Sequence, residues 1–147
     1  MTTIVIATDG SPQAREAVEY GLELAAAENA KAVLLQVMPP TDWTRLDRGG
    51  LLRPLAEEMH LHDAPALAEA AELASEHGVP YATEVIAGRP ADEIVAYADS
   101  IGADLIVIGS RGRGAVAGAL MGSVSRDVLR ESRKPVVVVP STPKVAV

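Results

Sequence analysis

The 147-residue sequence contains no cysteine and no phenylalanine, and aromatic residues make up only 3% of it. Without cysteine, the chain cannot form a disulfide scaffold, a thiol nucleophile, a cysteine-ligated zinc site or an iron–sulfur cluster. The few aromatic rings offer almost no surface on which bases can stack, which argues against binding of single-stranded nucleic acid. The absence of cysteine also fits a reducing compartment, so we expect a cytoplasmic location.

Positive charge is scarce as well. The 13 Lys and Arg residues are outnumbered by 20 Asp and Glu residues, and the net charge of −7 disfavours a DNA or RNA partner. No apolar run approaches the roughly 20 residues that a membrane-spanning helix needs. The first residues run directly into a strand pattern, without the basic region of a signal peptide. We therefore expect neither a nucleic acid nor a membrane as partner.

What the sequence does contain is 48% hydrophobic residues, arranged in alternating strand and helix patterns that predict a single α/β domain. Short apolar runs predict strands at residues 4–7, 32–37, 81–87, 104–108 and 136–139. Capping residues and helical spacing predict helices that begin at Pro12, at Pro65, at Pro90 and at Ser123. The second is expected to end near His77, the third at Gly102 and the last near Arg133. Strands that alternate with helices predict a parallel sheet covered by helices on both faces. Residues 39–64 are expected to form a variable loop, and residues 141–147 a loose tail.

In such sheets, ligands bind beyond the carboxyl ends of the strands, where the strand order reverses. A glycine-rich segment, which begins Gly109-Ser110-Arg111-Gly112-Arg113-Gly114, follows the fourth predicted strand, and Gly122-Ser123 opens the last helix. Glycines let backbone amides approach an anion, and the start of a helix offers unpaired N–H groups. Residues 109–134 also contain six basic and two acidic residues within an acidic chain. This pattern predicts a cradle for a small phosphorylated ligand, although a flexible loop with solvated arginines has the same composition.

Two common phosphate motifs fit less well. A P-loop requires a Gly-Lys pair, which the chain lacks. A dinucleotide fingerprint can be read at residues 112–117, but no acidic residue ends the strand that follows, at 136–139. The carboxylate that would bind the ribose is therefore missing.

The long glycine spacing Gly109-x2-Gly112-x9-Gly122-Ser123 resembles the nucleotide-binding pattern of the universal stress protein family. The opening strand that ends in Thr-Asp-Gly-Ser, Gly88-Arg89-Pro90 and the closing Lys134–Val139 segment are also similar to that family. The resemblance extends over about residues 2–140. It implies a Rossmann-like, adenine nucleotide alpha hydrolase-like sheet, for which we predict the strand order 3-2-1-4-5. One departure is Gln36, at a position where a histidine is frequent.

The resemblance implies an ATP-binding regulatory protein of the stress response, and it implies roles for individual residues. The adenosine end of the nucleotide would be surrounded by Ala7, Asp9 and Val37. The ribose and phosphates would be lined by Gly109, Arg111, Gly112 and Arg113. Amides and hydroxyls for the phosphates would come from Gly122, Ser123, Val124 and Ser125. ATP, with or without Mg²⁺, is the expected cofactor, and AMP and cyclic AMP remain alternatives.

The resemblance also implies a homodimer in which strand five, with Val136, Val137, Val138 and Val139, meets its copy, and a further protein partner of unknown identity. Two other functions stay open, a dimeric interaction protein that binds no nucleotide and a slow ATPase. We identify no catalytic residue, because the serines lack a histidine partner and Asp9 lacks a second carboxylate. We also expect no metal ligands, since His60 and His62 are spaced i, i+2 and do not share a helix face.

Overall fold

The computed structural model describes residues 2–38, 65–111 and 121–141. Within them, strands and helices alternate along the chain as the sequence predicts. In chain order they are β1 (Thr3–Ala7), α1 (Pro12–Ala27), β2 (Lys31–Met38), α4 (Pro65–Glu76), β3 (Tyr81–Ala87), α5 (Pro90–Ser100), β4 (Leu105–Gly109), α6 (Ser123–Glu131) and β5 (Val136–Val139). The predicted variable loop, 39–64, and the predicted tail beyond residue 141 lie outside the described residues.

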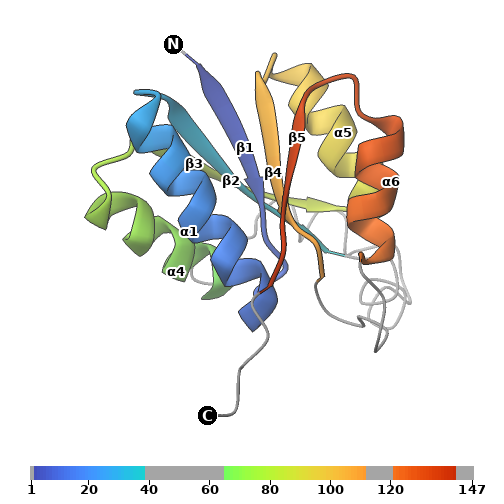
Figure 1. The fold of residues 1–147 in the computed structure, drawn as a ribbon, viewed down its shortest axis with the longest axis horizontal. Helices are drawn as coiled ribbons and strands as arrows, with labels where there is room; N and C mark the ends of the chain where they lie inside the picture. The colour runs from blue at the N-terminus through green and yellow to red at the C-terminus, as the bar shows by residue number, and fades with distance from the viewer. Residues whose placement is uncertain (1, 39–64, 112–120, 142–147) are drawn as a thin grey trace, which may run out of the picture.

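The five strands form one parallel sheet in the order β3-β2-β1-β4-β5, which confirms the predicted topology (Figure 1). β1 occupies the centre, where Ile4 is paired with Ala32 of β2 on one side and with Leu105 of β4 on the other. A central strand that is covered on both faces must be apolar throughout. This requirement explains why the four residues of β1 that follow Thr3 are a continuous run of buried aliphatic residues.

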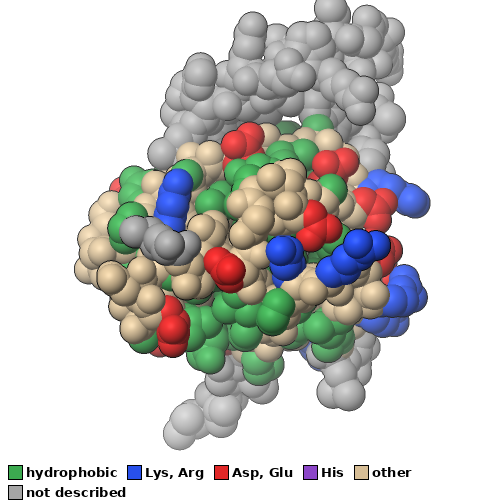
Figure 2. All heavy atoms as spheres, turned by 90° about the horizontal axis from the view of Figure 1, so that it is seen from above, with side chains coloured by type: hydrophobic (Ala, Val, Ile, Leu, Met, Phe, Trp, Pro, Cys, Tyr) green, Lys and Arg blue, Asp and Glu red, His purple; other side chains and the backbone are tan. Residues whose placement is uncertain are grey.

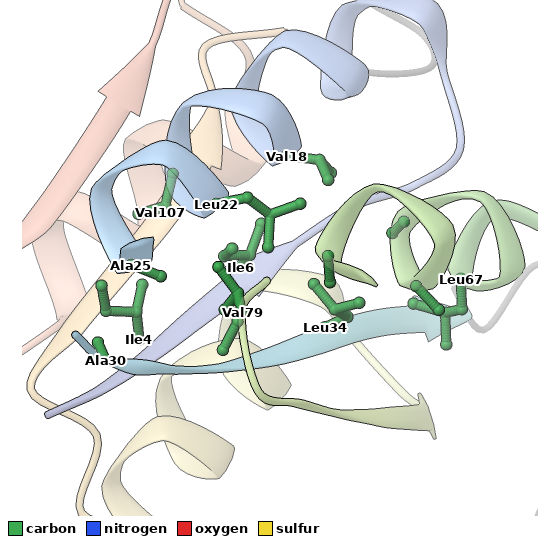
Figure 3. Close-up of a cluster of buried hydrophobic side chains, with 14 residues drawn as sticks. Ile4, Ile6, Val18, Leu22, Ala25, Ala30, Leu34, Leu67, Val79 and Val107 are labelled. Atoms are coloured by element: carbon green, nitrogen blue, oxygen red, sulfur yellow. The ribbon is translucent and has the colours of Figure 1, made fainter. Parts of the chain in front are cut away.

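Helices cover both faces of the sheet, α1 and α4 on one side and α5 and α6 on the other. Successive side chains of β1 point to opposite faces, so Ile6 packs in the core under α1 and α4 while Val5 packs under α5 and α6. Figure 3 shows the first of these cores, in which Leu22 of α1 and Leu67 of α4 lie over the strands. None of the helices that the structure describes is long and apolar enough to cross a membrane.

The small residues of α1 allow the helix to lie close to the sheet. Gly21 is buried in the middle of α1, and a Cβ atom built on it would come 2.7 Å from Cδ1 of Ile6 and 3.4 Å from Cγ1 of Val107. There is therefore no room for a side chain at this position. The alanine-rich composition of the chain is explained in part by this short distance between layers.

The last helix ends at Glu131, two residues before the predicted end at Arg133. Ser132 adopts an extended conformation, and its hydroxyl group donates to the carbonyl of Lys134 while it accepts from the Lys134 N–H. Serine side chains compete with the helix for backbone partners in this way. The local hydrogen bonds of Ser132 therefore turn the chain into β5 earlier than hydrophobic spacing indicates.

Candidate functional site

The strand order reverses between β1 and β4, so the crevice beyond their carboxyl ends is the expected ligand site. α1 begins directly beyond β1, and α6 begins near the end of β4 (Figure 1). The residues predicted from the two halves of the sequence therefore meet at one end of the sheet. Gly112 and Arg113 are the two predicted site residues that lie outside the described part of the chain.

Three predicted residues converge on one face of the sheet. Ala7 belongs to the core cluster between the sheet and helices α5 and α6, and both Val37 and Val124 pack against the same cluster. They come from β1, β2 and α6, respectively. The structure thus brings together a small apolar set drawn from distant parts of the sequence, next to the start of α6.

The loop after β1 is a tight turn organised by its own side chains. The Ser11 N–H donates to Oδ1 of Asp9 over 2.9 Å, and the Gly10 N–H donates to the hydroxyl of Thr8 over 3.2 Å. Gly10 has a φ of 79°, which glycine adopts without strain. Asp9, which is partly buried, therefore shapes the turn through one carboxylate oxygen.

Helix α1 is capped by its own sequence. The hydroxyl of Ser11 accepts from the Ala14 N–H over 3.1 Å, and Pro12 occupies the first helical position, which needs no N–H partner. Both features confirm the sequence prediction. Because this side-chain cap already uses an orphan amide, the start of α1 is less suited to an anion than an uncapped helix.

Helix α6 begins in the opposite way. Its N-cap is Gly122, which has no side chain to accept from the first turn, and the first turn contains no acidic residue. The first intrahelical bond runs from the Arg126 N–H to the Gly122 carbonyl. The amides of Ser123, Val124 and Ser125 thus precede the helical ladder, and no acceptor for them lies among the residues that the structure describes. An anion would satisfy these donors and would be favoured by the helix dipole.

The carbonyl of Ser110 joins the two ends of the glycine-rich segment. It accepts from the Gly122 N–H over 2.6 Å and from the hydroxyl of Ser125 over 3.0 Å. The same hydroxyl also lies 3.0 Å from the Gly122 carbonyl. We call this arrangement of Ser110, Gly122 and Ser125 the Ser110 clasp. Sequence reasoning missed it, and its one local signal is that Ser125 shares a helix face with the apolar Val128 three residues later.

Gly109 serves a packing role that the sequence did not reveal. A Cβ atom at this position would lie 3.2 Å from the Arg111 carbonyl oxygen and 3.6 Å from that of Gln13 in the first turn of α1. The tight distance is the one to Arg111, so the glycine makes room for the backbone that follows β4, whereas the distance to α1 is an ordinary van der Waals contact.

Gln36, the departure noted in the sequence, has a buried Oε1 with no donor among the described residues. A buried acceptor without a partner costs about 1–3 kcal/mol.

Within the described ranges, no group of three His, Asp or Glu side chains is arranged to hold a metal ion. His77 instead lies at the end of α4, where its Nδ1 is 2.8 Å from the Leu73 carbonyl oxygen, and His60 and His62 fall outside the described residues.

Comparison with known proteins supports the resemblance seen in the sequence. Residues 1–140 match the Universal stress protein family. A universal stress protein of Methanocaldococcus jannaschii is 34% identical over 136 residues, which are 92% of this chain and 80% of that protein. Some relatives are longer, since the chain spans 49% of a universal stress protein of Mycobacterium tuberculosis that is 30% identical to it.

Two solved structures show the same fold with an adenine nucleotide in complex. A universal stress protein in complex with cAMP has a TM-score of 0.71 and 30% identity, covering 96% of this chain and 98% of its own. A universal stress protein from Archaeoglobus fulgidus in complex with dAMP has a TM-score of 0.66 and 25% identity, covering 94% of this chain and 97% of its own. With the family match over nearly its whole length, the chain belongs to the universal stress protein family.

Proposed function

We propose that this chain binds an adenine nucleotide at the crevice between β1 and β4 and acts as a regulatory protein, with ATP as its ligand. The observation that carries the proposal is the start of α6, where three backbone amides have no acceptor among the described residues and no side-chain cap. The nucleotides bound by the cAMP and dAMP complexes of two relatives support an adenine ligand.

In this proposal the two ends of the nucleotide meet different parts of the site. The adenosine end lies against Ala7, Asp9 and Val37, where the apolar cluster and the β1 turn are found. The phosphates meet the glycine-rich segment and the first turn of α6, whose members are Gly109, Arg111, Gly112, Arg113, Gly122, Ser123, Val124 and Ser125. Basic residues outnumber acidic ones around this turn, so the local charge favours the anionic end.

Titration calorimetry with adenosine, AMP, ADP and ATP tests this division. Adenosine retains the contacts at β1 and β2 but loses those to the α6 amides. Because a hydrogen bond to a charged group contributes about 1.5–3 kcal/mol, ADP should bind at least about tenfold more tightly than adenosine. The gain from ADP to ATP should be smaller if the last phosphate reaches solvent.

Equal affinity for adenosine and ADP would contradict a phosphate cradle at α6. No binding of any of the four ligands would refute the nucleotide proposal as a whole and would favour an interaction protein. Guanosine diphosphate serves as the control, since it carries the same phosphates on a different base and reports what the adenine contacts add.

We also propose that two copies of the chain pair through β5. This strand lies at the edge of the sheet, where its backbone groups on one side have no neighbouring strand among the described elements. The Pro135 carbonyl accepts from Ile106 of β4, and the Val139 carbonyl accepts from Ser110, directly after β4. The alternating geometry of a strand therefore turns the amide and carbonyl of Val136 and Val138 toward the open edge. Such an edge is a template for pairing with another strand.

Apolar side chains flank this edge on both faces of the sheet. On α1, Arg15 forms an ion pair with Glu69 of α4, and Leu24 lies about 180° around the helix from it, on the flank toward β5. Tyr20, which is 46% exposed, lies on the same flank. On α6, Leu129 is 43% exposed and points away from the side that meets α5.

The space-filling view agrees with this description. In Figure 2, apolar side chains gather along the lower rim of the molecule. This rim is the side that faces the viewer in Figure 1, where β5 lies in front. Acidic and basic side chains are interspersed over the rest of this view. A second copy of the chain would cover the open edge and the apolar flanks together.

A further inference from the structure

The hydroxyl proton of Ser125 is already used in hydrogen bonds within the protein. Its oxygen lies 3.0 Å from the Ser110 carbonyl and 3.0 Å from the Gly122 carbonyl, and both of these groups are acceptors. A hydroxyl carries a single proton, so these two carbonyls share it. The side chain is only 2% exposed, which removes it from contact with any ligand that approaches from solvent.

Gly122 is bound into the same arrangement. Its N–H donates to Ser110 over 2.6 Å, and a Cβ atom built on it would lie 3.3 Å from the Ser110 carbonyl oxygen and 4.0 Å from the Ser125 hydroxyl. The missing side chain of Gly122 therefore makes room for the Ser110 clasp. Its amide is unavailable to a phosphate, because the carbonyl of Ser110 occupies it.

The clasp fixes the start of α6 to the end of β4. Ser110 follows the last residue of β4, and Ser125 lies in the first turn of α6. The 15-residue separation between them contains the glycine-rich segment apart from Gly109. With both ends of that segment held at one carbonyl, the direction of the first α6 amides relative to the sheet is set before a ligand arrives.

We infer that Ser125 is a positioning residue of the nucleotide site: its hydroxyl does not donate to the phosphates but holds the Ser110 clasp closed, so that the α6 amides point into the crevice. This role rests on the proposed nucleotide binding. It differs from the role that the family resemblance implies for the Ser125 hydroxyl, and it leaves the Ser125 amide as a ligand. Ser123, by contrast, is exposed and lies two residues earlier, on another side of the helix.

The first arm of the test uses the protein without nucleotide. Amide hydrogen exchange of Gly122 is measured by NMR in the wild type, in Ser125→Ala and in Ser123→Ala. Loss of a hydrogen bond worth about 1 kcal/mol should speed exchange at Gly122 about fivefold in Ser125→Ala. Ser123→Ala, the matched control on the same helix turn, should leave it unchanged. A direct ligand role for the Ser125 hydroxyl predicts no change in either variant.

The second arm compares ADP with adenosine by calorimetry. In Ser125→Ala, ADP should lose about fivefold in affinity while adenosine binds as it does to the wild type, because only the phosphate end meets α6. Val128→Ala is the structural control, since Val128 is fully buried on the same helix. It should lower the melting temperature without changing the ratio of the two affinities.

The outcomes separate the two proposals. Unchanged exchange at Gly122 in Ser125→Ala would overturn the inference, and so would faster exchange with an unchanged ratio of ADP to adenosine affinity. Faster exchange together with a smaller ratio supports it. If the wild type binds neither ligand, the proposed function fails, whereas the exchange arm still decides whether Ser125 holds the clasp.

Discussion

At the residue scale, Glu131 shows how two helices bring like charges together. Partial desolvation, a hydrogen bond with Asp92 of α5 and the negative charges of Asp92 and Asp127 raise its pKa above the ordinary value of 4.5, and Arg130 opposes the shift. The folded state therefore holds this proton more tightly than the unfolded chain, and the free energy of unfolding falls as pH rises from 4.5 through the raised pKa. In Glu131→Gln this pH-dependent loss of unfolding free energy is absent, because the amide does not titrate.

We expect Glu131→Gln to melt at a higher temperature than the wild type at pH 7, with the difference shrinking as the pH falls toward 4. Calorimetric melting over this pH range measures it. Glu72→Gln, a change at an exposed site on α4, controls for the general effect of removing one negative charge. A difference in melting temperature that stays constant from pH 4 to pH 7 would contradict the raised pKa of Glu131.

At the element scale, the distance between α1 and the sheet depends on one glycine. Gly21→Ala should gain about 1 kcal/mol of helix propensity but lose more through the clash of the new methyl with Cδ1 of Ile6. We expect a net loss of about 1–2 kcal/mol in denaturant unfolding. Ile6→Val removes that Cδ1 atom but keeps Cγ1, which would lie 2.9 Å from the new methyl, so the clash is relieved in part and the double variant should be more stable than the sum of the two single changes predicts. If the changes in unfolding free energy of the two single variants add up to that of the double variant, the new methyl is accommodated by atoms other than Cδ1 of Ile6.

At the scale of the whole molecule, the β5 edge decides the proposed assembly. Val138→Pro removes an N–H that points to the open edge, a substitution that edge strands tolerate. Sedimentation analysis should show the wild type as a dimer and Val138→Pro as a folded monomer. Val137→Pro is the control, because its amide lies on the β4 side and its loss should lower stability instead. A Val138→Pro dimer of wild-type affinity would place the interface elsewhere.

Much of the architecture follows from sequence pattern, whereas the site detail follows from tertiary contact. An apolar run predicts β1 closely, since a buried parallel strand tolerates little else, and a run of four valines between two prolines predicts β5, which is half-buried at the sheet edge. The Ser110 clasp was not predictable in the same way, because its partners are 15 residues apart and meet only when α6 packs on the sheet. Gly109 was assigned to the ligand from the family pattern, while its contact with α1 depends on a helix nearly 100 residues earlier.

The junction between β1 and β4 joins the first three strands of the sheet to the last two. Three residue pairs align along it, from Ile4–Leu105 to Ile6–Val107, against seven pairs between β2 and β3. A molecule bound across this junction would contact the turn after β1 and the start of α6 at once. It would therefore link two parts of the chain that are separated by about 100 residues. Such a ligand would bind only where the two parts are folded together, so the bound fraction would follow the fraction of molecules with an intact sheet.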